Sequence, residues 1–84
     1  MGQHTTKQQL DFMVKLVNRQ AGFDPNHIDY STLHSYALDK DIAGYRLVQI
    51  VNDSGAERTI TEPGTKAQCF AQVRAFYHGM RAML

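Results

Sequence analysis

The residue of this chain best placed for catalysis is Cys69, the only cysteine. It falls near the start of the C-terminal amphipathic segment, where a helix dipole can lower the pKa of a thiol and make it a nucleophile. However, Cys69 shares a helical stripe with Val73, Phe76 and Met80. Because free cysteines are among the most buried residue types, we predict an inert core thiol.

The histidines and carboxylates are scattered in a way that argues against a metal or acid–base site. No histidine has another metal ligand at helical i, i+4 spacing, and a zinc site needs three or four converging ligands. The histidines are His4, His27, His34 and His78. The carboxylates at expected turns and strand ends are Asp39, Asp41, Asp53, Glu57 and Glu62. Turn and edge roles account for these carboxylates, so we predict no catalytic residue, no metal and no cofactor.

Length and charge narrow the remaining classes of function. The 84 residues correspond to one domain, which we place at residues 1–84. Nine Lys and Arg nearly balance eight Asp and Glu, for a net charge of +1, whereas nucleic-acid binders usually carry a basic excess. The same balance disfavours a membrane-surface protein. The segment MGQHTTKQQL has no apolar signal core, and no apolar run approaches the roughly 18 residues of a membrane span, so we expect a cytoplasmic protein.

Hydrophobic periodicity predicts a helix at each end of the chain. The first runs over about 6–21 before Gly22, a natural helix terminator, and the second follows Pro63-Gly64. The expected capping boxes are Thr6 with Gln9 and Thr65 with Gln68. Both helices have an apolar side wide enough to cover a core.

Three strands are expected between the helices. Tyr36 and Leu38 alternate with polar residues, 45–51 is the strongest strand, and 57–61 is rich in β-branched residues. The turn at 53–55 contains Gly55, which can adopt a positive φ. Short connections imply an antiparallel meander. The sequence therefore predicts an α+β fold of order α-β-β-β-α, with two helices packed on one face of a three-stranded antiparallel sheet.

The first expected helix carries an apolar residue away from its core side. Phe12 lies nearly opposite Leu10 on the helical wheel, near Lys15 and Arg19. Either the loop over 23–28 folds over this ring, or the ring is an aromatic contact with basic neighbours. The second composition is typical of protein interfaces. Phe12, Lys15 and Arg19 are therefore candidate protein-binding residues.

The central strand has apolar residues on both faces. Tyr45 and Leu47 lie on one face, and Val48 and Ile50 lie on the other. A sheet covered on one side only alternates more cleanly. Either these are scattered exposed apolar residues, or a partner covers the open face, most simply a second copy in a homodimer. We favour the partner and predict a second protein-binding surface at Tyr45 and Leu47.

The expected element order is also that of double-stranded-RNA-binding domains, which grip phosphates from the start of their last helix. The segment PGTKAQCFAQVRAF resembles that region in outline. The family carries a cluster of lysines there, whereas this chain has Lys66 followed by Ala67 and Gln68. The resemblance is topological and makes nucleic-acid binding through Lys66, Arg74 and Arg81 the alternative function, one that the charge balance disfavours.

Three stretches resemble small uncharacterised accessory proteins of tailed bacteriophages and prophages. They are NRQAGF, SYALDKDIAGYRLVQIVNDSGAERTI and AQVRAFYHGMRAM. The matching pieces are Asn18-Arg19, Gly22, Tyr36, Gly44, Val51-Asn52-Asp53, Gly55, Ala75-Phe76 and Gly79. The resemblance implies an accessory protein that binds a host component, components of immunity included. Our expectation is a non-enzymatic module that acts by protein–protein interaction, with inhibition of a host or defence factor as its role.

Overall fold

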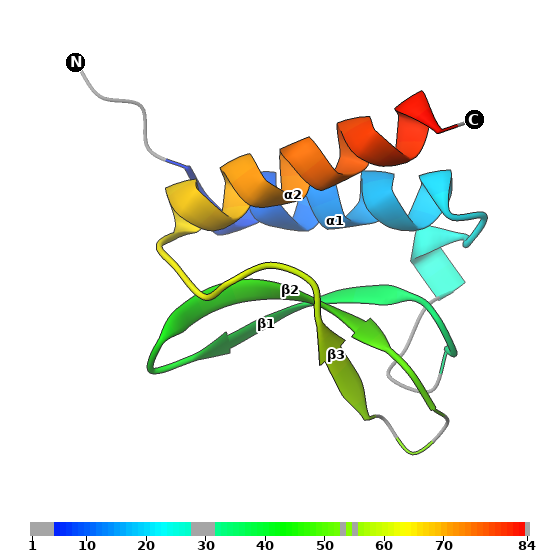
Figure 1. Ribbon diagram of the computed structural model, residues 1–84, viewed down its shortest axis with the longest axis horizontal. Helices are drawn as coiled ribbons and strands as arrows, with labels where there is room; N and C mark the ends of the chain where they lie inside the picture. Colours follow the sequence, from blue (N-terminus) through cyan, green and yellow to red (C-terminus); the bar gives the residue numbers. More distant parts are fainter. Residues whose placement is uncertain (1–4, 28–31, 53, 55, 84) are drawn as a thin grey trace.

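The computed structural model describes residues 5–27, 32–52, 54 and 56–83, in which two helices lie over a small sheet (Figure 1). In chain order the elements are α1 Lys7–Gln20, a 3-10 turn η1 Pro25–His27, β1 Tyr36–Asp41, β2 Gly44–Ile50, β3 Glu57–Thr59 and α2 Lys66–Ala82. The sheet is antiparallel with the order β1-β2-β3. The predicted α+β fold and its α-β-β-β-α order are confirmed. His4, Ile28, Asp53 and Gly55, which entered the predictions, lie outside the described residues.

Both helices begin at the predicted capping boxes. The Thr6 hydroxyl accepts the Gln9 N–H at 3.1 Å, and the Gln9 side chain accepts the Thr6 N–H at 2.8 Å. Thr65 and Gln68 make the same two hydrogen bonds at 3.1 and 2.9 Å. Each box satisfies two backbone N–H groups that a helix start leaves without intrahelical partners. Gly22 follows the end of α1 with a φ of +96°, as predicted for a terminator.

The two helices run side by side in the same direction over one face of the sheet (Figure 1). The core lies between the two layers. Its buried members are Leu10, Met13, Val14, Val17, Leu47, Cys69 and Val73. Tyr36 of β1 joins this core at its edge, where its ring meets Phe76 of α2 with centroids 5.5 Å apart.

A buried asparagine joins the helix layer to the sheet. The Asn18 side chain donates to the Tyr36 carbonyl at 2.9 Å and accepts the Tyr36 N–H at 2.7 Å. The amide thus satisfies both backbone groups of the first residue of β1, in the way that a neighbouring strand would. Asn18 is 4% exposed, so both hydrogen bonds are shielded from water.

The β1–β2 turn is tied to the start of α2. Tyr45 and Gly64 form an isolated antiparallel bridge, with N–H to carbonyl distances of 2.8 and 3.0 Å. Gly44 has a φ of +123°, and a Cβ at this position would lie 2.4 Å from the Gly64 carbonyl oxygen. Glycine is therefore required here both by its backbone conformation and by the close approach of the second chain segment.

The predicted binding surface on the central strand is wrong. Leu47 is fully buried beneath the helices, and Tyr45 is half-buried against the same core. On the other side of β2, Val48 and Ile50 are 0% and 1% exposed. Val48 is paired with Ala37 of β1 and Thr59 of β3, as expected for a central strand. Among the described residues, the buried side chains of β2 thus offer no exposed apolar surface to a second copy. The homodimer itself stays a prediction.

Candidate functional site

The Cys69 thiol belongs to the core and not to a reactive site. The side chain is 0% exposed, and burial raises the pKa of the thiol while a hydrogen bond with Thr61 partly opposes this rise. A thiol held in its neutral form is a poor nucleophile. The predicted place of Cys69 in the core is confirmed, and its lack of reactivity stays a prediction. Within the described residues, no group of three His, Cys, Asp or Glu side chains is close enough to hold a metal ion.

The shortest contact between a histidine and a carboxylate among the described residues is local to a turn. His27 Nδ1 lies 2.7 Å from Asp24 Oδ2, and both side chains are exposed. The Asn26 backbone N–H and then His27 hold the pKa of Asp24 below its ordinary value. Hydrogen bonds of this kind close the turn at η1 and require no catalytic role.

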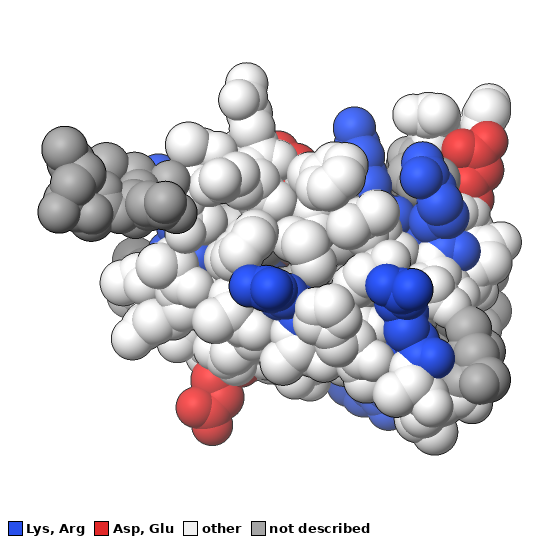
Figure 2. All heavy atoms as spheres, turned by 90° about the horizontal axis from the view of Figure 1, so that it is seen from above, with Lys and Arg blue, Asp and Glu red and all other residues white. Residues whose placement is uncertain are grey.

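Positive charge is concentrated on the helix layer of the fold. The two helices carry six of the nine Lys and Arg residues and one of the eight Asp and Glu residues. The basic residues are Lys7, Lys15 and Arg19 of α1 and Lys66, Arg74 and Arg81 of α2. Figure 2 shows these blue groups spread over the helix side, with acidic groups only near its rim. The near-zero net charge therefore conceals a basic surface.

We call this surface the helical face and define it by Phe12, Lys15, Arg19, Phe70, Arg74, His78 and Arg81. Within the described residues, no carboxylate lies within ion-pairing distance of Lys15, Arg74 or Arg81. The Arg81 guanidinium instead stacks over the Tyr77 ring at 5.7 Å. Arg19 contributes to the lowered pKa of Asp24 without a direct ion pair. Cations without carboxylate partners are available to an external anion.

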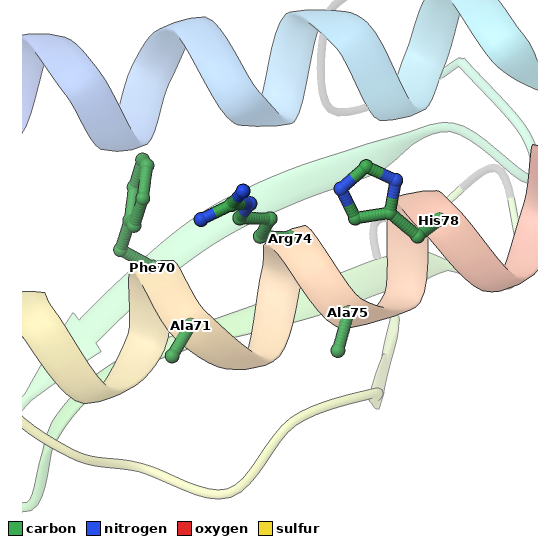
Figure 3. Close-up of a pocket in the computed structure, with 5 residues that line it drawn as sticks. All are labelled: Phe70, Ala71, Arg74, Ala75 and His78. Atoms are coloured by element: carbon green, nitrogen blue, oxygen red, sulfur yellow. The ribbon is translucent and has the colours of Figure 1, made fainter.

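A hollow opens on α2 within the helical face. Phe70, Arg74 and His78 project from α2 toward α1, and Ala71 and Ala75 lie along the edge of the same stripe that is turned away from α1 (Figure 3). These five residues enclose about 360 Å³, and we call this the α2 hollow.

A second hollow lies beside the first, between the starts of the two helices. It measures about 390 Å³ and is lined by Thr6, Gln8, Gln9, Phe12, Met13 and Phe70. Phe70 lines both hollows, so Phe12 of α1 and Arg74 of α2 belong to one continuous surface. The sequence placed these two residues in competing functions, and the fold brings them together.

Phe12 is 59% exposed, which tests one of the two interpretations of this ring, while its role in protein binding stays a prediction. The loop that follows α1 does not bury it, so that interpretation is wrong. Ile42, in the β1–β2 turn, is 108% exposed and was missed by the sequence analysis. An apolar residue at a turn tip carries no periodic signal, which is why the pattern did not reveal it. Lys66 is exposed at the start of α2, as the nucleic-acid alternative requires.

No helix in the described part of the chain has the length and apolar character needed to cross a membrane. Comparisons with protein-family models, with curated proteins and with solved structures found no match to this chain. The helical face and its two hollows are therefore the features that a functional assignment has to explain.

Proposed function

We propose that this protein is a non-enzymatic binding module that acts by protein–protein interaction through its helical face. The observation that carries the proposal is the exposed ring of Phe12 beside Phe70, with Arg74 and Arg81 on the same face. Neither guanidinium pairs with a carboxylate in the part of the chain that the structure describes. Protein interfaces are enriched in aromatic residues and arginine. Such residues also supply most interface hot spots.

The resemblance to bacteriophage accessory proteins supports a bacterial partner. On that basis the protein works in the host cytoplasm, and inhibition of a host or defence factor is its role. Binding alone is sufficient for such a role, because an inhibitor needs only to occupy a surface that its target uses. The helical face provides that surface on the helix layer, which covers one face of the sheet (Figure 1).

A capture experiment with matched variants tests this proposal. The tagged full chain is incubated with a nuclease-treated bacterial lysate, beside a Phe12→Ala/Arg19→Glu variant and a control, Ile42→Ala/Arg58→Glu. The control makes the same two kinds of change on exposed residues of the sheet layer. We expect the control to retain a protein that the helical-face variant loses, with both variants folded by circular dichroism. Retention of the same protein by the helical-face variant would contradict the proposal.

The charge division on the helices favours one alternative, a nucleic-acid binder that uses Lys66, Arg74 and Arg81. Affinity from phosphate neutralisation falls steeply as salt rises. A titration of labelled double-stranded RNA and DNA at low and at physiological salt distinguishes the two functions. Absence of binding at low salt would remove the alternative, whereas steeply salt-dependent binding that Arg74→Glu weakens would favour it.

A further inference from the structure

The solvent side of α2 has small side chains at regular spacing. Ala67, Ala71, Ala75 and Gly79 recur every four residues, and all four are exposed. In helix packing, the ridge of one helix enters the groove that runs along an i±4 row of another. A row of small residues lets a second helix approach closely, since no long side chain stands between the two backbones.

Gly79 has no structural explanation within the chain itself. It lies in the last turn of α2, three residues before Ala82, and a Cβ built on it would meet nothing within 4 Å. Glycine is a weaker helix former than alanine, so the isolated protein gains nothing from it. A glycine allows a second backbone to approach closely, which would give Gly79 a role when another helix packs against α2.

Two arginines flank this row at a spacing that suits a helix. Arg74 and Arg81 are seven residues apart, which places them on the same side of α2 and about 10.5 Å apart along its axis. Neither has a carboxylate partner among the described residues. The planar guanidinium fork matches the geometry of a carboxylate and binds it with two hydrogen bonds.

We propose that α2 docks one amphipathic α-helix of an acidic protein partner. Two carboxylates one heptad apart on that helix pair with Arg74 and Arg81, and its apolar side chains enter the α2 hollow beside Phe70 and Ala75. This inference rests on the proposed function and adds the chemistry of the partner. A nucleic-acid backbone would use the same cations, but it would have no use for the small-residue row beside them.

A displayed library of helical peptides tests the docking. Peptides of about 20 residues, or about 30 Å of helix, are long enough to cover α2. Each carries a fixed leucine stripe, and two flanking positions seven residues apart vary among Glu, Gln and Lys. Selection against the immobilised full chain is expected to enrich Glu at both positions. Enrichment of Gln or Lys, or no enrichment, would overturn the proposal.

Variants then locate the binding of a selected peptide by fluorescence anisotropy. Ala75→Leu fills the hollow without disfavouring a helix, and we expect it and Arg74→Glu each to weaken binding about tenfold or more. The control Arg58→Glu, on exposed β3, is expected to bind as the wild type does. The Arg74→Glu/Arg81→Glu variant should bind the peptide that carries Lys at both varied positions. Exchanging the charges on both molecules restores binding only when these side chains pair directly. Unchanged binding by Ala75→Leu, or failure of the exchange, would overturn the proposal.

A competition experiment tells whether the helical face binds nucleic acid and not a protein helix. If a duplex of RNA or DNA displaces the selected peptide at physiological salt, the helical face serves nucleic acid and the proposed partner is wrong. The capture experiment with Phe12→Ala/Arg19→Glu changes only α1. A protein can therefore be captured through α1 even when no helical peptide is selected by α2. Failure of the peptide selection refutes the docking of a helix on α2, and failure of the capture experiment refutes the proposed function.

Discussion

One arginine of the sheet layer and two arginines of the helix layer differ in whether a carboxylate balances their charge. In the sheet layer, Arg46 donates to Asp39 at 2.8 and 3.0 Å and approaches Asp41 at 3.9 Å. In the helix layer, Arg74 and Arg81 have no carboxylate partner among the described residues. Arg46 is thus compensated within the fold, whereas no described carboxylate balances Arg74 or Arg81. The net charge of +1 does not show this difference, because carboxylates elsewhere in the chain offset the positive excess of the helices.

The largest effect is expected where the two layers are joined. Asn18→Ala leaves the N–H and carbonyl of Tyr36 buried without partners, and we expect a loss of about 2–4 kcal/mol in the free energy of unfolding. Urea denaturation followed by circular dichroism measures it. The control Gln8→Ala changes an exposed amide of the same helix and should leave stability within about 0.5 kcal/mol. Equal stability of the two variants would contradict this role for Asn18.

A glycine in each layer gives the next comparison, with effects of opposite sign. Gly44→Ala places a Cβ against the Gly64 carbonyl at a positive φ, and we expect a loss of about 1–3 kcal/mol. Gly79→Ala meets open space in a helix and should stabilise the protein by about 0.5–1 kcal/mol. Thermal unfolding of both variants provides the measurement. A loss at Gly79 would mean that the isolated protein needs this glycine.

The two kinds of arginine should differ in stability by a smaller amount. Arg46→Gln removes a half-buried ion pair, for which we expect a loss of about 0.5–1 kcal/mol at low salt. Arg74→Gln removes no ion pair, so its stability should stay within about 0.5 kcal/mol of the wild type. Denaturation at low and high salt checks both, since screening should reduce only the Arg46 effect. A larger loss at Arg74 would contradict the division between the layers.

The smallest effect is a dependence on alkaline pH through Cys69. Because burial raises the pKa of this thiol in the folded state, the unfolded chain ionises first, near the ordinary value of 9.0. The contribution of Cys69 to stability is therefore intact below pH 9 and declines above it. Unfolding measured across this range should show a steeper decline in the wild type than in Cys69→Ala. Identical pH profiles, or rapid labelling of the native thiol, would contradict the buried site.

Local signals predicted the helices well, because capping depends on residues three positions apart. Thr6 with Gln9 and Thr65 with Gln68 located both helix starts. The third strand was predicted to reach Thr61, yet β3 ends at Thr59. The Leu47 N–H is accepted by the Thr61 hydroxyl at 2.9 Å in place of a backbone carbonyl, and the regular ladder stops there. A hydroxyl that replaces a backbone carbonyl as hydrogen-bond acceptor has no periodic signature in the sequence.

The candidate site shows a different limit of sequence reasoning. A period of two shows that Leu47 and Val48 lie on opposite faces of β2, but it does not tell which face the helices cover. The apolar residues on both faces of β2 are buried, and the sequence pattern alone therefore led to the wrong prediction that one face is an exposed binding surface. Likewise, helical periodicity placed Phe12 and Arg74 outside the core of their own helices. Only the packing of α1 beside α2 shows that the two residues share one face.

The parallel course of α1 and α2 has a consequence for any attempt to shorten this protein. Helices joined by a short connection run antiparallel, so two neighbours that point the same way need a long return path between them. In this chain the three-stranded meander is that return path, from the end of α1 at Gln20 to the start of α2 at Lys66. A miniaturised helical hairpin that kept both helix sequences would reverse one of them. The helical face would then be lost even though every one of its residues was retained.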